Sequence, residues 1–174
     1  MQNPIFDKFG RNKLTELLDE YLENNITLKI FRMRDVKLPE RCGKNAGFDF
    51  FIPRDYNDGN NFIVDIGSSV LIPSGIKVKI PRGHALIAFN KSGISTKMEL
   101  QVGACVVDEN YTGEIHLHLI NIGINPVELN PGMKILQFLL IKINYAIPME
   151  ISNEKDMLWN NKERGDGGFG STGS

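Results

Sequence analysis

The amino-acid sequence predicts an all-β fold, a sandwich or barrel, on three observations. Short apolar segments recur at regular spacing between Thr27 and Ile143. Several of them alternate apolar and polar residues, which is the period of a half-buried strand. Most are separated by turns that contain proline or glycine, such as Pro73-Ser-Gly75 and Pro81-Arg-Gly83. Short strands punctuated in this way are typical of sandwiches and barrels.

One helix is predicted before the first strand. Asn12 suits its N-cap and Asn24-Asn25 its end, and between them apolar residues fall at helical spacing: Leu14, Leu17, Leu18, Tyr21 and Leu22. We expect residues 1–26 to form a helical extension that serves packing or subunit contact. Residues 27–160 form the predicted β domain, and residues 161–174 a mobile arm.

The predicted strands follow in chain order. They are Thr27–Met33, Ala46–Ile52, Phe62–Val64, Ser69–Ile72, Ile76–Ile80, Ala85–Phe89, Ala104–Val107, Ile115–Ile120, Val127–Leu129 and Lys134–Ile143.

The composition and charge of the chain argue against several classes of function. The chain has 174 residues and a net charge of −1, without a long basic run. Binding to nucleic acid or to a membrane surface therefore has no electrostatic support, and we expect neither partner. No apolar run reaches membrane-spanning length, so we expect a soluble intracellular protein. Cys42 and Cys105 lie far apart in the sequence, which argues against a disulfide or a zinc site.

The stretch from Gly103 to Ile120 is the centre of the predicted site. The apolar run Ala104–Val107 is interpreted as a buried strand, and Asp108-Glu-Asn has turn chemistry. The chain then returns as a second strand. This pattern predicts a hairpin that carries Asp108 and Tyr111 at its tip. An ordinary β-turn is the alternative, and it is favoured while this stretch is considered alone.

Other polar residues interrupt apolar strands. Asp49 needs a partner or faces a site, since an unpaired buried carboxylate is costly. The turn Asn90-Lys-Ser-Gly93 is an ordinary loop or, with its lysine, hydroxyl and backbone N–H groups, an anion site. His116 and His118 alternate on one strand, and a structural role is favoured because no third metal ligand has suitable spacing. Gln137 either satisfies a backbone group or faces a polar ligand.

The C-terminal segment combines four properties that suit a nucleotide. Arg164 offers a bidentate fork for phosphate, and Phe169 a flat face for a base. Ser171 and Thr172 add hydroxyls. The glycines, among them Gly170, let backbone N–H groups approach a phosphate. We therefore interpret the segment as a lid over a nucleotide, with a plain linker as the alternative.

Five motifs in order resemble the trimeric dUTPase family, viral and phage-like members included. They are Ala46-Gly-Phe-Asp49-Phe, Lys91-Ser-Gly93, Val107-Asp-Glu-Asn-Tyr-Thr-Gly113, Gly132-Met-Lys-Ile-Leu-Gln137 and Arg164-Gly-Asp-Gly-Gly-Phe-Gly-Ser-Thr-Gly173. The resemblance runs from Leu28 to the C-terminus and leaves the N-terminal helix outside. The third and fifth motifs are the specific ones.

The resemblance implies a jelly-roll-like distorted β-barrel with a flexible glycine-rich arm. Three subunits form a homotrimer with sites at subunit interfaces. The implied reaction is cleavage of dUTP to dUMP and pyrophosphate with Mg²⁺, which limits uracil incorporation into DNA and supplies dUMP for thymidylate synthesis. The implied location is the cytoplasm, or for a viral protein the host cytoplasm or nucleus.

The resemblance also implies roles for single residues. Asp108 is the base that activates a water, Tyr111 packs under the deoxyribose, and Asp49 supports the metal through water only. Backbone groups near Cys105 and His116 read the uracil edge. The implied substrate-binding residues are Lys91, Ser92, Gly93, Cys105, Val107, Tyr111, His116, Gln137, Arg164, Phe169, Gly170, Ser171 and Thr172.

Two departures and two alternatives accompany the resemblance. Lys91 stands where the family commonly has arginine, and a lysine lacks the bidentate fork. Met133-Lys134 replaces a commoner acidic-Arg pair. A dCTP deaminase on a similar fold needs a catalytic glutamate, and the matching position here is His118. The other alternative is a non-catalytic interaction protein, against which the joint retention of Asp108, Tyr111, Arg164 and Phe169 argues.

Overall fold

A computed structural model of the chain describes residues 13–24 and 26–157, and most of its elements are short β-strands. The strands are β1 (Lys29–Arg32), β2 (Gly47–Phe51), β3 (Phe62–Val64), β4 (Ser69–Pro73), β5 (Ile76–Lys79), β6 (His84–Asn90), β7 (Leu100–Val102), β8 (Val106–Val107), β9 (His116–Asn121), β10 (Val127–Leu129) and β11 (Lys134–Lys142). The helices are α1 (Lys13–Asn24), α2 (Ser92–Met98) and the 3₁₀ turns Tyr56–Gly59 and Glu154–Met157. The prediction of an all-β class with one N-terminal helix is confirmed.

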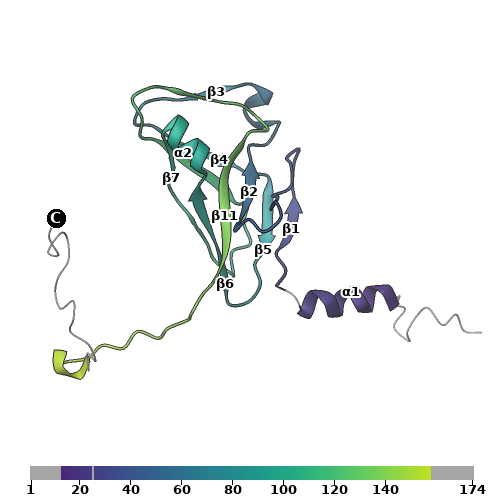
Figure 1. Cartoon of the computed structure of the whole chain (residues 1–174), viewed down its shortest axis with the longest axis vertical. Helices are drawn as coiled ribbons and strands as arrows, with labels where there is room; N and C mark the ends of the chain where they lie inside the picture. The colour runs from purple at the N-terminus through teal and green to yellow at the C-terminus, as the bar shows by residue number, and fades with distance from the viewer. Residues whose placement is uncertain (1–12, 25, 158–174) are drawn as a thin grey trace, which may run out of the picture. The chain divides into compact units, whose positions relative to one another are not determined.

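The described strands form four antiparallel sheets. The largest has the order β2-β11-β6-β8, so that β11 lies between β2 and β6 (Figure 1). A three-stranded sheet has the order β4-β9-β7, and two ribbons pair β1 with β5 and β10 with β3. The turn between β4 and β5 requires Gly75, whose φ is +73°.

The core lies between these sheets and follows from the alternation seen in the sequence. Along β9, Leu117 and Leu119 are fully buried while the residues between them are not. The rings of Phe50 and Phe138 lie 4.5 Å apart between centroids. Burial of each such side chain stabilises the fold by roughly 1.5–3 kcal/mol.

The predicted hairpin around Asp108 is wrong. The strand before the turn, β8, pairs with β6, whereas β9 pairs with β4 and β7. The turn therefore connects two different sheets. The run before it is not buried either, since Ala104 is exposed and Val106 is 59% exposed. All four residues of this run line a pocket, and Cys105 and Val107 also pack against the core.

The helix α2 and the strand β7 were not predicted from the sequence, nor were the two 3₁₀ turns. The segment from Lys91 was interpreted as a turn or anion loop, and it begins a two-turn helix with Lys91 as N-cap. β7 has only three residues and pairs with β9. Runs this short carry little periodicity.

Within the described part of the N-terminal extension, Lys13–Asn24 form the predicted helix, α1. The described leucines of α1, Leu14, Leu17 and Leu18, are between 54% and 71% exposed in the single chain. After β11 the chain divides into a second compact unit that begins at Tyr145. None of the described helices is both long and apolar enough to cross a membrane.

Candidate active site

A pocket of about 240 Å³ lies beside the loop that connects β8 to β9. It contains five residues that the sequence analysis assigned to the site, from one continuous stretch: Cys105, Val107, Asp108, Tyr111 and His116. Its remaining lining comes from Leu71, Ala104, Val106, Glu114, Ile115 and Phe138. Asp108, the carboxylate predicted as the base, thus borders a largely apolar pocket. Small-molecule sites usually combine apolar lining with a few polar groups in this way.

The Asp108–Gly113 turn has a fixed shape. The backbone N–H of Tyr111 donates to the carbonyl of Asp108 (3.1 Å), which closes the turn. The Tyr111 hydroxyl donates to the carbonyl of Glu114 (2.8 Å). The ring thereby lies over Gly113, where an added Cβ would sit 2.4 Å from the Tyr111 hydroxyl oxygen. Glycine at 113 is therefore required for this ring position.

Two glutamates tie the same loop to neighbouring turns. Glu114 Oε1 accepts the backbone N–H of Gly75 (2.6 Å), in the turn between β4 and β5. Glu109 Oε2 accepts the backbone N–H of Gly83 (2.7 Å), in the turn before β6. Since both turns belong to the sheet scaffold, the carboxylate of Asp108 is presented from a loop held at both sides.

His118 has a structural role, as the sequence analysis favoured. Its Nδ1 accepts the backbone N–H of Ala104 (2.8 Å), so a neutral ring carries its proton on Nε2. The ring also fills the space beside Gly103, where a Cβ would lie 2.2 Å from Nδ1. His118 therefore holds the backbone at Gly103 and Ala104, beside the pocket. Of the two histidines, His116 lines the pocket and His118 does not.

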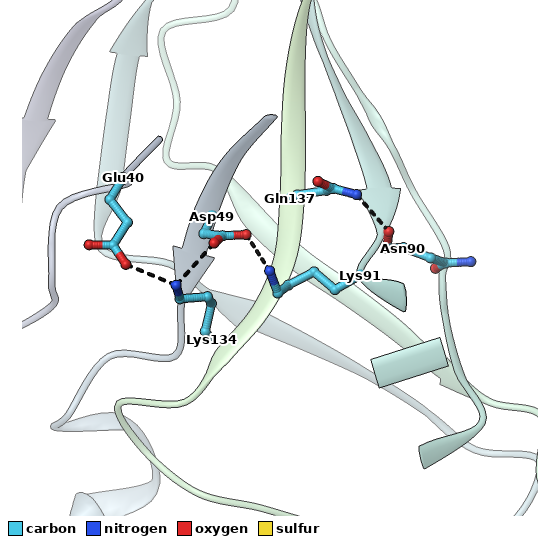
Figure 2. A network of polar contacts seen from close by, with 6 residues as sticks. All are labelled: Glu40, Asp49, Asn90, Lys91, Lys134 and Gln137. Atoms are coloured by element: carbon cyan, nitrogen blue, oxygen red, sulfur yellow. Dashed lines mark hydrogen bonds and ion pairs between the residues drawn. The ribbon is translucent and has the colours of Figure 1, made fainter. Parts of the chain in front are cut away.

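A second group of predicted residues gathers where β2, β6 and β11 lie side by side (Figure 2). Lys91 Nζ contacts Asp49 Oδ1, and Lys134 Nζ lies 3.0 Å from Asp49 Oδ2. Lys134 Nζ also lies 2.9 Å from Glu40 Oε1. Asp49 therefore has partners, which is one of the two alternatives that the sequence left open.

The charges of this cluster shift one another's pKa. Burial raises the pKa of Asp49, but the hydrogen bonds from Lys91 and Lys134 outweigh it and leave the pKa below its ordinary 3.8. Glu40 and Asp49 raise the pKa of Lys134 above its ordinary 10.5. The carboxylates of Asp49 and Glu40 and the ammonium of Lys134 are therefore charged at neutral pH.

Gln137 lies next to this cluster and satisfies a backbone group. It is paired with Asp49 across the sheet, and its Nε2 donates to the carbonyl of Asn90 (2.9 Å). Gly47 on β2 leaves room for it, because a Cβ there would lie 3.0 Å from Gln137 Oε1. Ser92 and Gly93, the first residues of α2, are both exposed.

The structure thus groups the predicted residues into two sets with no member in common. One set lines the pocket, and the other surrounds Asp49. Arg164, Phe169, Gly170, Ser171 and Thr172 lie outside the described residues. Glu40 in the cluster and Leu71 in the pocket were not predicted from the sequence, because neither belongs to a motif and only the strand pairing brings them there.

An all-β scaffold with an apolar pocket, a carboxylate at its rim and a separate cluster of paired lysines and carboxylates describes a class of small-molecule enzymes. Within that class, the chain belongs to the dUTPase family, whose sequence profile matches residues 36–173.

Relatives and solved structures agree with this assignment. The mouse deoxyuridine 5′-triphosphate nucleotidohydrolase is 30% identical over 153 residues, which is 87% of this chain and 88% of that protein. The fowlpox virus protein of the same name is 30% identical over 83% of this chain and 95% of its own length. A mutant dUTPase of Staphylococcus bacteriophage 80alpha bound to dUpNHpp has the same fold, with a TM-score of 0.73, 20% identity and coverage of 86% and 100%. The jelly-roll-like fold is thereby confirmed.

The family implies Mg²⁺, and the residues fit only an indirect role in holding it. The described part of the chain has no group of three His, Cys, Asp or Glu side chains placed to bind a metal. Asp49 already contacts two ammonium groups. Mg²⁺ commonly keeps several waters and binds substrate phosphates, so a contact from Asp49 through water is compatible with the cluster.

Proposed function

We propose that this protein hydrolyses dUTP to dUMP and pyrophosphate, with Asp108 as the general base. The observation that carries the proposal is the position of Asp108, at the rim of an apolar pocket and on a loop held from both sides. Membership of the dUTPase family supports the same reaction.

In the proposed reaction a water attacks the α-phosphorus of dUTP. The water gives one proton to the Asp108 carboxylate as its oxygen bonds to phosphorus, and the bond from the α-phosphorus to the bridging oxygen breaks. Pyrophosphate leaves with that oxygen. A positioned carboxylate is needed because neutral water is a poor nucleophile, and general-base assistance is worth about 10²–10⁴ in rate.

The pocket is proposed to hold the deoxyuridine. Backbone groups near Cys105 and His116 read the donor and acceptor order of the uracil edge, which differs from that of cytosine. Tyr111, held over the turn by its bond to Glu114, packs under the sugar and excludes a 2′-hydroxyl. The 5-methyl group of thymine would clash in this narrow hollow.

The lysines of the cluster around Asp49 are proposed to receive the triphosphate. Lys91 turns from Asp49 to a phosphate, and Ser92, Gly93 and Gln137 add hydroxyl and N–H donors. Mg²⁺, when bound, would neutralise phosphate charge as a Lewis acid, with Asp49 contacting its water shell. Lys134 stays with Asp49, so the carboxylate keeps one partner when Lys91 leaves.

We propose a homotrimer with sites between subunits. The proposal follows the family resemblance, in which one site combines the pocket set of one subunit with the cluster set of a neighbouring subunit. The large sheet exposes apolar side chains suited to such contact, because Val106, 59% exposed, pairs with Ile87 on the face that also carries Phe89, 42% exposed. Light scattering should give the mass of three chains, and a monomer mass for active protein would contradict this arrangement.

Pyrophosphate release from dUTP, dCTP, dTTP and UTP tests the function. We expect turnover of dUTP alone, and a fall of kcat by about 10²–10⁴ in Asp108→Asn with dUTP binding retained. Full activity of that variant would refute the assigned base. Ammonia release from dCTP would instead indicate a deaminase, against which the hydrogen-bonded His118 argues.

A further inference from the structure

The ribbon of β1 and β5 carries a basic face that the proposed reaction does not use. The two strands are antiparallel, with Lys29 opposite Lys79 and Phe31 opposite Lys77. Opposite residues share a face of a sheet, as do residues two apart along a strand. All four side chains therefore project from one face, which we call the Lys–Phe face.

The ring on this face is accessible. Phe31 is 66% exposed, Lys29 and Lys79 are exposed, and Lys77 is half-buried. Together with Ile30 and Val78 these residues line a shallow hollow of about 230 Å³. An aromatic ring left open between cations is available for stacking by a flat partner.

The three lysines have no acidic partner among the described residues. The ion pairs found there use other cations, namely Arg34, Lys37, Lys91 and Lys134. Lys29 also lies directly opposite Lys79, and like charges in that position destabilise a sheet. An anion bound across the ribbon would remove this repulsion.

We propose that the Lys–Phe face binds single-stranded nucleic acid. Such strands offer what the face lacks, a row of phosphates for the lysines and an unpaired base to stack on Phe31. An acidic peptide would supply the charge without a flat base. The net charge of −1 led us to expect no nucleic-acid partner, but it averages over the chain, and strand pairing gathers lysines that are distant in sequence.

Fluorescence anisotropy of a labelled oligothymidine with the full-length protein tests the proposal. A non-hydrolysable dUTP analogue is added to occupy the active sites. Three phosphate contacts predict a slope of about −2 for log affinity against log salt, which makes binding about 20-fold weaker at 200 mM salt than at 50 mM. Absence of binding at 50 mM salt overturns the proposal.

Variants separate charge from stacking. Lys79→Gln should reduce the salt slope by about 0.7. Phe31→Leu, which keeps an apolar side chain without a π-face, should weaken binding roughly 5- to 150-fold with the slope unchanged. Lys142→Gln, an exposed strand lysine outside the face, is the matched control and should bind as wild type.

All three variants should keep the kcat and KM for dUTP, which shows that they fold and that the face is separate from the active site. Equal weakening by Lys142→Gln overturns the proposal, as does unchanged binding in Phe31→Leu. Polyglutamate that binds as well as the oligonucleotide also overturns it, because the face would then select charge alone.

Discussion

Replacement of Gly113 by alanine should move Tyr111 and thereby damage the pocket. The added methyl would lie 2.4 Å from the Tyr111 hydroxyl oxygen and 2.5 Å from its Cζ, both far inside van der Waals contact. The ring must swing away, which breaks its 2.8 Å bond to the Glu114 carbonyl. That bond contributes about 0.5–1.5 kcal/mol, so the free energy of unfolding should fall by about 1 kcal/mol.

The effect on substrate should be larger than the effect on stability, because the displaced ring occupies the pocket. We expect a raised KM for dUTP, measured by pyrophosphate release, and a stability change measured by urea unfolding. The matched control is the same change in a Tyr111→Ala background, where the methyl meets no ring. Gly113 is not at positive φ, so there the alanine should be neutral or stabilising by about 0.4–1 kcal/mol.

The double-mutant cycle therefore predicts a coupling energy of about 1–2 kcal/mol between the two positions. A coupling energy below about 0.3 kcal/mol together with an unchanged KM would show that the Tyr111 ring does not lie over Gly113.

Three further outcomes can be measured. Asp49→Asn should lower the free energy of unfolding at pH 7. The difference in this free energy between variant and wild type should vanish as the pH falls through the pKa of folded Asp49, which lies below 3.8. A difference that persists at pH 2 would contradict the ion pairs. Gly47→Ala should weaken dUTP binding by pushing Gln137 from the Asn90 carbonyl, and unchanged calorimetric affinity would speak against that role. Truncation after Glu163 should leave a folded protein whose kcat for dUTP is strongly reduced, whereas near-normal kcat would identify the removed segment as a linker.

Strand positions were predictable because most strands alternate or are bounded by turn residues. β10 has the bounds that its sequence predicts, and β11 differs by one residue. Pairing was not predictable in the same way. β8 and β9 flank a short turn, which suggests a hairpin, but β8 has only two residues and pairs with β6. Partner choice depends on long-range packing that local pattern does not encode.

The candidate site was predictable where motifs are continuous in sequence. Asp108 and Tyr111 lie in one stretch, and the pocket contains both. The contacts of Lys134 and Glu40 with Asp49 were not predictable, since three separate segments meet there. Gln137, which the sequence left undecided, donates to a backbone carbonyl in the described chain.

The turn that carries Asp108 connects two sheets, so the width of the pocket depends on how the core packs between them. Phe138 shows the link, because its ring is 1% exposed, contacts Phe50 and also lines the pocket. A change of one methyl group deep between the sheets would alter their spacing, and the loop would transmit that change to the nucleotide. Substitutions of core residues that never touch the substrate can therefore change the affinity for it. A core substitution that alters stability is then expected to alter affinity as well.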